Sequence, residues 1–117
     1  MQLIDNILVP QGLYIVSTPI GNLKDITIRA LTILKNCNTI ACEDTRVTRK
    51  LLSHYEIKSK NLTSLYEFTP QHKLIYLIKK IKNGESIALV SNAGTPIISD
   101  PGLKLIVLAI KNGIKII

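Results

Sequence analysis

Residues 86–90, with the sequence SIALV, decide the fold of this chain. This short run of mostly branched apolar residues is typical of a strand buried on both faces of a sheet. Gly84, just before it, stands where a preceding helix would end. Residues 91–101 are rich in Pro, Gly and small polar side chains, which indicates a loop. A helix to Lys111 follows this loop, so the segment reads as one unit of an alternating α/β fold.

The same alternation of strand and helix patterns extends along the rest of the chain. Apolar runs predict further strands at residues 13–16, 39–42, 62–66 and 114–117. Helical spacing of apolar residues predicts helices that begin after an Asp25 cap, at a Thr45 cap and at Pro70. We therefore predict a doubly wound α/β fold, with a parallel sheet of about five strands flanked by helices.

The length of 117 residues allows one domain at most. We assign residues 1–12 to an N-terminal arm and residues 13–117 to the α/β domain. The chain halts inside the last predicted strand, with no further helix to cover it. We therefore expect the domain to be truncated and a second domain to be absent.

Composition excludes several classes of protein. No apolar run reaches the roughly 18 to 20 residues that a membrane span needs, and the first residues include Asp5 without the basic start of a signal peptide. We therefore expect a cytoplasmic protein with no membrane segment. The two cysteines, Cys37 and Cys42, have no Cys or His partners at metal spacing, and a zinc site needs about four ligands. We expect two reduced, buried thiols and no metal.

The formal net charge of +7 is compatible with RNA binding, because a basic surface attracts phosphates. The basic residues are mostly Lys, and only Arg29, Arg46 and Arg49 are Arg. A genome drifting toward A and T would give the same composition. Charge therefore adds little to a nucleic-acid interpretation.

Unusual residues gather in three loops that follow predicted strands, where ligands bind in open α/β sheets. Residues 18–22 (TPIGN) lack the glycine fingerprints of nucleotide sites and form either a ligand loop or a simple turn. Glu43 and Asp44 precede a helix face with Arg46, Arg49 and Lys50, which could bind RNA phosphates. Alternatively, the carboxylates cap the helix and the cations are only solvated. Residues 91–96 (SNAGTP) favour a ligand loop, because small side chains expose the backbone.

Three motifs of the chain resemble those of the ribosomal RNA small subunit methyltransferase I family, within the tetrapyrrole methylase superfamily. They occur in the family's order and spacing from residue 13 to the chain end. The motifs are LYIVSTPIGNL at residues 13–23, CEDTR and TRKLL at residues 42–46 and 48–52, and AGTP and ISDPG at residues 93–96 and 98–102. The chain thus looks like the N-terminal domain of such an enzyme.

The resemblance implies a two-domain homodimeric enzyme that binds S-adenosylmethionine between its domains. It would methylate the 2′-hydroxyl of a cytidine ribose in small-subunit rRNA. The implied cofactor residues are Pro19, Ser91, Asn92, Ala93, Gly94 and Thr95. The residues expected to meet RNA are Thr45, Arg46, Arg49 and Lys50. The family supplies no secure catalytic base, and the candidates are Glu43, Asp44, Glu67 and Asp100.

The chain departs from the family pattern at two places. Asn92 stands where the family usually has Asp, which removes a negative charge from the cofactor loop. Phe68 and Thr69 replace the His and Asn that usually follow Glu67. Three other interpretations therefore stay open: a different methyltransferase of the superfamily, such as a tetrapyrrole or diphthamide-pathway enzyme; a non-catalytic domain that binds RNA or a partner; or a decaying product without function.

Overall fold

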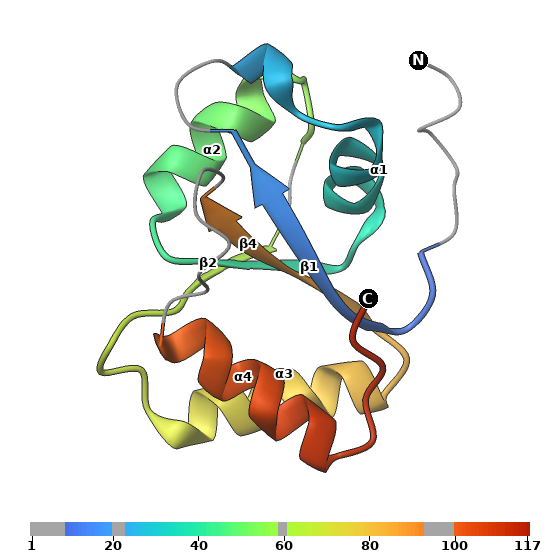
Figure 1. The fold of residues 1–117 in the computed structure, drawn as a ribbon, viewed down its shortest axis with the longest axis vertical. Coiled ribbons are helices and arrows are strands. Elements are labelled where there is room, and N and C mark those ends of the chain that lie inside the picture. The colour runs from blue at the N-terminus through green and yellow to red at the C-terminus, as the bar shows by residue number, and fades with distance from the viewer. Residues whose placement is uncertain (1–8, 20–22, 59–60, 93–99) are drawn as a thin grey trace.

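The computed structural model describes residues 9–19, 23–58, 61–92 and 100–117. Strands and helices alternate along the chain (Figure 1). The elements in order are β1 (Gly12–Thr18), a short 3-10 turn η2 (Leu23–Asp25), α1 (Ile28–Asn36), β2 (Thr39–Cys42), α2 (Thr45–His54), β3 (Asn61–Ser64), α3 (Gln71–Lys82), β4 (Ser86–Asn92) and α4 (Asp100–Lys111). The predicted α/β class with a parallel sheet is confirmed.

In the described part of the chain, four parallel strands form one sheet in the order β1-β4-β2-β3. The strand at residues 86–90 is central, as its apolar sequence indicates, and it pairs with β1 on one side and β2 on the other. Successive side chains of a strand point to opposite faces. Ile87 and Leu89 accordingly join one core cluster, and Ala88 joins the other.

Each face of the sheet is covered by two helices (Figure 1). Helices α1 and α2 pack on one face through buried residues that include Leu34 and Leu52. Helices α3 and α4 pack on the other face, with Leu77, Ile81 and Leu105 buried there. Because both faces of the sheet are covered, residues 87–90 of β4 are all apolar.

Two predicted helix caps were wrong by one or two residues. Thr27, and not Asp25, caps α1: its side-chain oxygen accepts a hydrogen bond from the Ala30 N–H at 3.0 Å. Asp25 instead ends the 3-10 turn. Asp44, and not Thr45, caps α2, because its carboxylate accepts from the Arg46 N–H and Thr45 is already helical. The ends of α3 and α4 were predicted correctly, and Gly84 and Gly113 follow them at φ values of 101° and 71°.

The predicted strands at residues 62–66 and 114–117 are shorter than expected. The first is Asn61–Ser64, because Tyr66 turns away and its N–H binds the Thr69 hydroxyl oxygen instead of a strand. The second makes only an isolated bridge between Leu13 and Ile116, although hydrogen bonds at 2.9 Å join Ile117 and β1 in both directions. The C-terminal residues thus lie beside β1 and are hydrogen-bonded to it.

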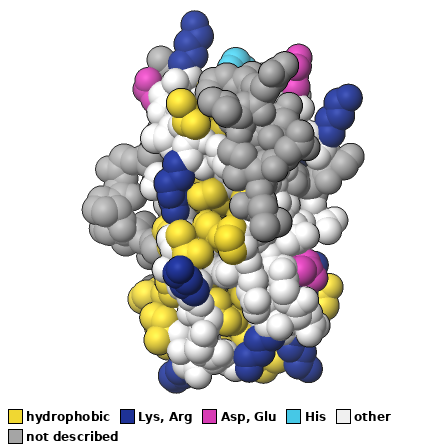
Figure 2. Space-filling model, turned by 90° about the vertical axis from the view of Figure 1, so that its right-hand side faces the viewer, with side chains coloured by type: hydrophobic (Ala, Val, Ile, Leu, Met, Phe, Trp, Pro, Cys, Tyr) yellow, Lys and Arg dark blue, Asp and Glu magenta, His cyan; other side chains and the backbone are white. Residues whose placement is uncertain are grey.

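Hydrophobic side chains appear among lysines and arginines over the middle and lower part of the face drawn in Figure 2. The exposed apolar residues of α4 are Leu103, Val107 and Ile110, which share one side of the helix. Helix α4 covers the sheet face opposite to α2. The apolar surface of α4 is therefore separate from the charged surface of α2 described below.

Candidate functional site

The strands that precede the loops singled out by the sequence all end at one edge of the sheet, here called the functional edge. Because all four strands are parallel, their carboxyl ends at Thr18, Asn92, Cys42 and Ser64 lie along the same edge. The end of β1 is fixed to the end of β4, where the buried Thr18 hydroxyl donates to the Ser91 carbonyl at 3.2 Å. The carboxyl ends of the strands thus lie at the place where open α/β sheets bind ligands.

Of the predicted cofactor residues, the described ones lie at the ends of β1 and β4. Pro19 follows β1 directly and is partly exposed, and Ser91 is partly exposed near the end of β4. The backbone of Asn92 pairs with that of Thr18. The side chain of Asn92, and Ala93, Gly94 and Thr95 as a whole, lie outside the described residues. The structure therefore places Pro19 and Ser91 at the ends of two neighbouring strands, and their role as cofactor ligands stays a prediction.

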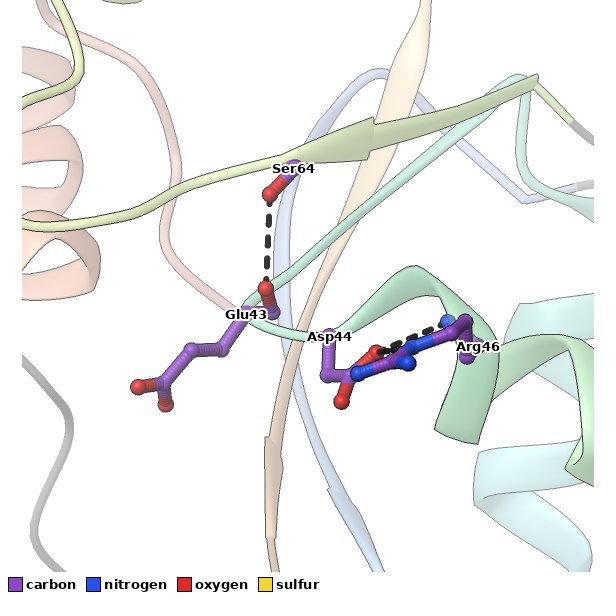
Figure 3. Close-up of polar contacts among 4 residues, drawn as sticks. All are labelled: Glu43, Asp44, Arg46 and Ser64. Carbon is purple, nitrogen blue, oxygen red and sulfur yellow. Dashed lines mark hydrogen bonds and ion pairs between the residues drawn. The ribbon is translucent and has the colours of Figure 1, made fainter.

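The adjacent carboxylates Glu43 and Asp44 point in different directions (Figure 3). The Asp44 carboxylate accepts the Arg46 N–H at 2.9 Å and lies 3.5 Å from Arg46 Nε. This backbone hydrogen bond, aided by the charge of Arg46, lowers the pKa of Asp44 below its ordinary value of 3.8. Asp44 thus stabilises the start of α2, as the capping interpretation proposed, and is a poor proton acceptor near neutral pH.

Glu43 is exposed, and its side chain extends away from the Asp44–Arg46 pair (Figure 3). Its backbone carbonyl accepts a hydrogen bond from the Ser64 hydroxyl at 3.3 Å, which ties the end of β2 to β3. Among the residues that the structure describes, the Glu43 carboxylate has no ion-pair partner. Glu43 is therefore held at its backbone while its carboxylate stays available.

Lys73, in the first turns of α3, is a site residue that the sequence did not reveal. Its Nζ donates to the Ser64 carbonyl at 2.6 Å, and the side chain is partly buried. A positive charge is thereby fixed at the carboxyl end of β3. No motif marks this lysine, because its partner depends on how α3 folds back over the sheet. Ser64 was expected in the middle of the strand predicted at residues 62–66, so the sequence did not mark it as a residue of the functional edge.

Glu67 and Asp100 are the two remaining candidates for a catalytic carboxylate, and the structure describes the side chain of Glu67 alone. Glu67 is exposed in the turn between β3 and α3, and exposed Tyr66 and Phe68 flank it. Asp100 begins α4, and its side chain lies outside the described part of the chain. Neither is brought into contact with Glu43 by a described hydrogen bond or ion pair.

The predicted RNA-contacting residues lie on the exposed side of α2. Arg46, Arg49 and Lys50 are exposed, and Thr45 is partly exposed at the helix start. Arg46 is engaged by Asp44, although 88 % of its side-chain surface is accessible. The basic face expected from the spacing therefore exists, and its binding to RNA remains a prediction.

The cysteines match the sequence interpretation, since both Cys37 and Cys42 are buried thiols. Burial raises the pKa of the Cys42 thiol above its ordinary value. Within the described ranges, no group of three or more His, Cys, Asp and Glu side chains could hold a metal ion. No helix among these residues is long and apolar enough to cross a membrane.

Replacing Asp44 by Ala should destabilise the domain in a pH-dependent manner. Because the pKa of Asp44 is lowered by folding, its stabilisation is fully present above the ordinary value of 3.8 and is lost as the pH falls through the folded pKa. The difference in Tm between wild type and D44A should thus be constant near neutral pH and shrink in acid. Asp44→Asn is the control, because Asn also caps helices and does not titrate. A difference in Tm that is independent of pH down to strong acid would contradict this assignment.

Comparisons with known proteins identify similar chains. A family model described as tetrapyrrole (corrin/porphyrin) methylases matches residues 12–117. The chain is 54 % identical, over 104 residues, to "Ribosomal RNA small subunit methyltransferase I" of Hydrogenobaculum sp. (strain Y04AAS1), and the match covers 89 % of this chain and 45 % of that protein. A protein of the same name from Vibrio cholerae is 51 % identical over 116 residues, covering 97 % and 40 %.

Among solved structures, the chain resembles cobalt precorrin-4 methyltransferase, a cobalamin biosynthetic enzyme, with a TM-score of 0.72. The sequences are 19 % identical, and the match covers 90 % of this chain and 43 % of that one. This likeness concerns the fold. The chain spans about half the length of the curated relatives it matches.

Proposed function

This chain belongs to the tetrapyrrole methylase family, and on that premise we propose that it forms one half of an S-adenosylmethionine-dependent methyltransferase of small-subunit rRNA. The observation that carries the proposal is the identity of about one half to relatives named as small-subunit rRNA methyltransferases. The motifs at residues 13–23 and 42–52 fall within the matched region. The target we infer is the 2′-hydroxyl of a cytidine ribose.

Small and polar residues at the ends of β1 and β4 support the assignment of a cofactor to this place. Small side chains stand there, Ser17, Thr18, Pro19 and Ser91, and the buried Thr18 hydroxyl holds the two strand ends together. Backbone groups can approach a ligand closely at such a place. We assign Pro19 and the segment from Ser91 to Thr95 to cofactor binding.

S-adenosylmethionine, when bound, would supply a methyl group on a positively charged sulfur. The part left to the protein is to orient the ribose hydroxyl and to take its proton as the new O–C bond forms. Glu43 suits the second task, because its carboxylate is exposed at the functional edge while Asp44 is occupied by the start of α2. Arg46, Arg49 and Lys50 suit the first task, because their charges can hold RNA phosphates.

We also infer that the complete enzyme is a cytoplasmic homodimer, as the resemblance implies. Both statements rest on relatives that are about twice as long as this chain. The cleft we propose for the cofactor would then be completed by residues outside residues 1–117.

A chimera tests the proposal with this chain in a full-length setting. Residues 1–117 would replace the matching part of the Hydrogenobaculum relative, which is 54 % identical there. We expect the chimera to transfer tritium from labelled cofactor to small ribosomal subunits, and the labelled nucleotide to resist alkaline cleavage, as a 2′-O-methyl group requires. Residues 1–117 alone should give no turnover. Labelling of a porphyrinoid in place of RNA would favour another enzyme of the superfamily, and turnover by the chain alone would contradict the half-enzyme proposal.

A further inference from the structure

A groove runs between α2 and β3, the strand at one end of the described sheet. Its volume is about 760 Å³, which is enough for a nucleotide. The groove lies away from the functional edge, because α2 leads from that edge toward the start of β3. The residues that line the groove are Arg49, Leu52, Ser53, Glu56, Ile57, Lys58 and Leu62.

The lining of the groove combines an apolar side with charged groups. Leu52 is buried, and Ile57 and Leu62 are partly buried in the same core cluster, so together they present a fixed apolar surface. Arg49 and Lys58 are both exposed and add two positive charges. Apolar contact for a ring and cations for phosphates are the two features that a nucleotide site needs.

Among the described lining residues, Glu56 is the one carboxylate, and its backbone follows the end of α2. Its φ of 56° lies in the left-handed region. Two backbone hydrogen bonds end α2 at this point. The Glu56 N–H donates to the Ser53 carbonyl at 3.1 Å, and the Ile57 N–H donates to the Leu52 carbonyl at 2.8 Å. The two cations and one carboxylate leave the lining with one net positive charge.

The groove is continuous with the basic face of α2, because Arg49 belongs to both. Arg46 and Lys50 lie on the same helix, one turn or less from Arg49. Arg46, Arg49 and Lys58 thus mark a route for an RNA backbone from the functional edge, along α2, into the groove, with the Glu56 carboxylate beside it. The exposed side chains of Arg49 and Lys58 in the groove favour an anionic partner over an uncharged one.

We propose that this groove binds a nucleotide that flanks the target in the RNA substrate. The base lies against Leu52, Ile57 and Leu62, and the adjoining phosphates contact Arg49 and Lys58. The proposal rests on the proposed function, since it takes the ligand to be RNA, and it adds a binding site outside the cofactor edge.

Direct binding of a fluorescent single-stranded RNA to residues 1–117 tests the groove without requiring catalysis. Lys58→Ala should weaken binding about 3- to 10-fold at low salt and reduce the slope of log Kd against log salt by about 0.7 to 1. Glu56→Gln should strengthen binding about 2-fold, because a like charge beside the phosphates is removed. The matched control is Lys104→Ala, which removes the same charge from an exposed position of α4, on the other face of the sheet.

The outcomes separate this proposal from the proposed function. A Lys58→Ala variant that behaves like its matched control would overturn the groove, while RNA binding and methyl transfer by the chimera could still hold. A wild-type chain that binds no RNA would overturn the groove together with the assignment of RNA to α2. If Lys58→Ala weakens binding of an oligoglutamate peptide and leaves RNA binding unchanged, the groove takes an acidic protein segment, and the RNA site is refuted.

Discussion

Glu43→Gln should lower methyl transfer by the chimera about 100- to 10,000-fold, the usual contribution of a positioned general base. The amide keeps the size and hydrogen-bonding oxygen of the side chain but cannot take a proton at neutral pH. Glu43 is exposed, and its structural contact is made by its backbone carbonyl with Ser64. The substitution should therefore leave the Tm and the affinity for RNA close to those of the wild type. The rate is measured on small ribosomal subunits with tritiated cofactor.

Two variants decide whether the loss belongs to Glu43 alone. Glu67→Gln removes an exposed carboxylate from the neighbouring turn and should change the rate less than Glu43→Gln. Asp44→Asn keeps a cap for α2 and should change the rate by a small factor, because Asp44 is already bound by Arg46. A chimera with Glu43→Gln that retains the wild-type rate would exclude Glu43 as the base and move the assignment to Glu67 or Asp100.

The fold was predictable because its signals are local. The run at residues 87–90 is wholly apolar, which is typical of a strand that is covered on both faces. Gly84 and Gly113 marked helix ends because their positive φ values favour glycine. The two predicted caps were misplaced because each has a second cap-forming residue close by. Thr27 caps α1 in place of Asp25, and Asp44 caps α2 in place of Thr45. The path of the loop before each helix selects between the two.

The functional edge was predictable only in part. Parallel strands bring their carboxyl ends together, so the loops after β1, β2 and β4 were expected to meet. The contact of Lys73 with Ser64 was not foreseen, because it joins a helix and a strand whose relative position follows from packing. The groove at Lys58 was missed for a similar reason: it exists only because β3 pairs with β2 beside α2.

Replacing Ile87 by Ala should cost about 2 to 5 kcal/mol of unfolding free energy, a large part of the 5 to 15 kcal/mol typical of domains. Ile87 is fully buried in the central strand, opposite Leu13 of β1 and Thr39 of β2. Its side chain belongs to the core cluster under α3 and α4, where removal of its outer carbons leaves a cavity. Ile110→Ala, at a residue 60 % exposed on α4, should change stability by about 0.5 kcal/mol or less. Urea unfolding followed by circular dichroism measures both, and equal effects at the two positions would contradict a central β4.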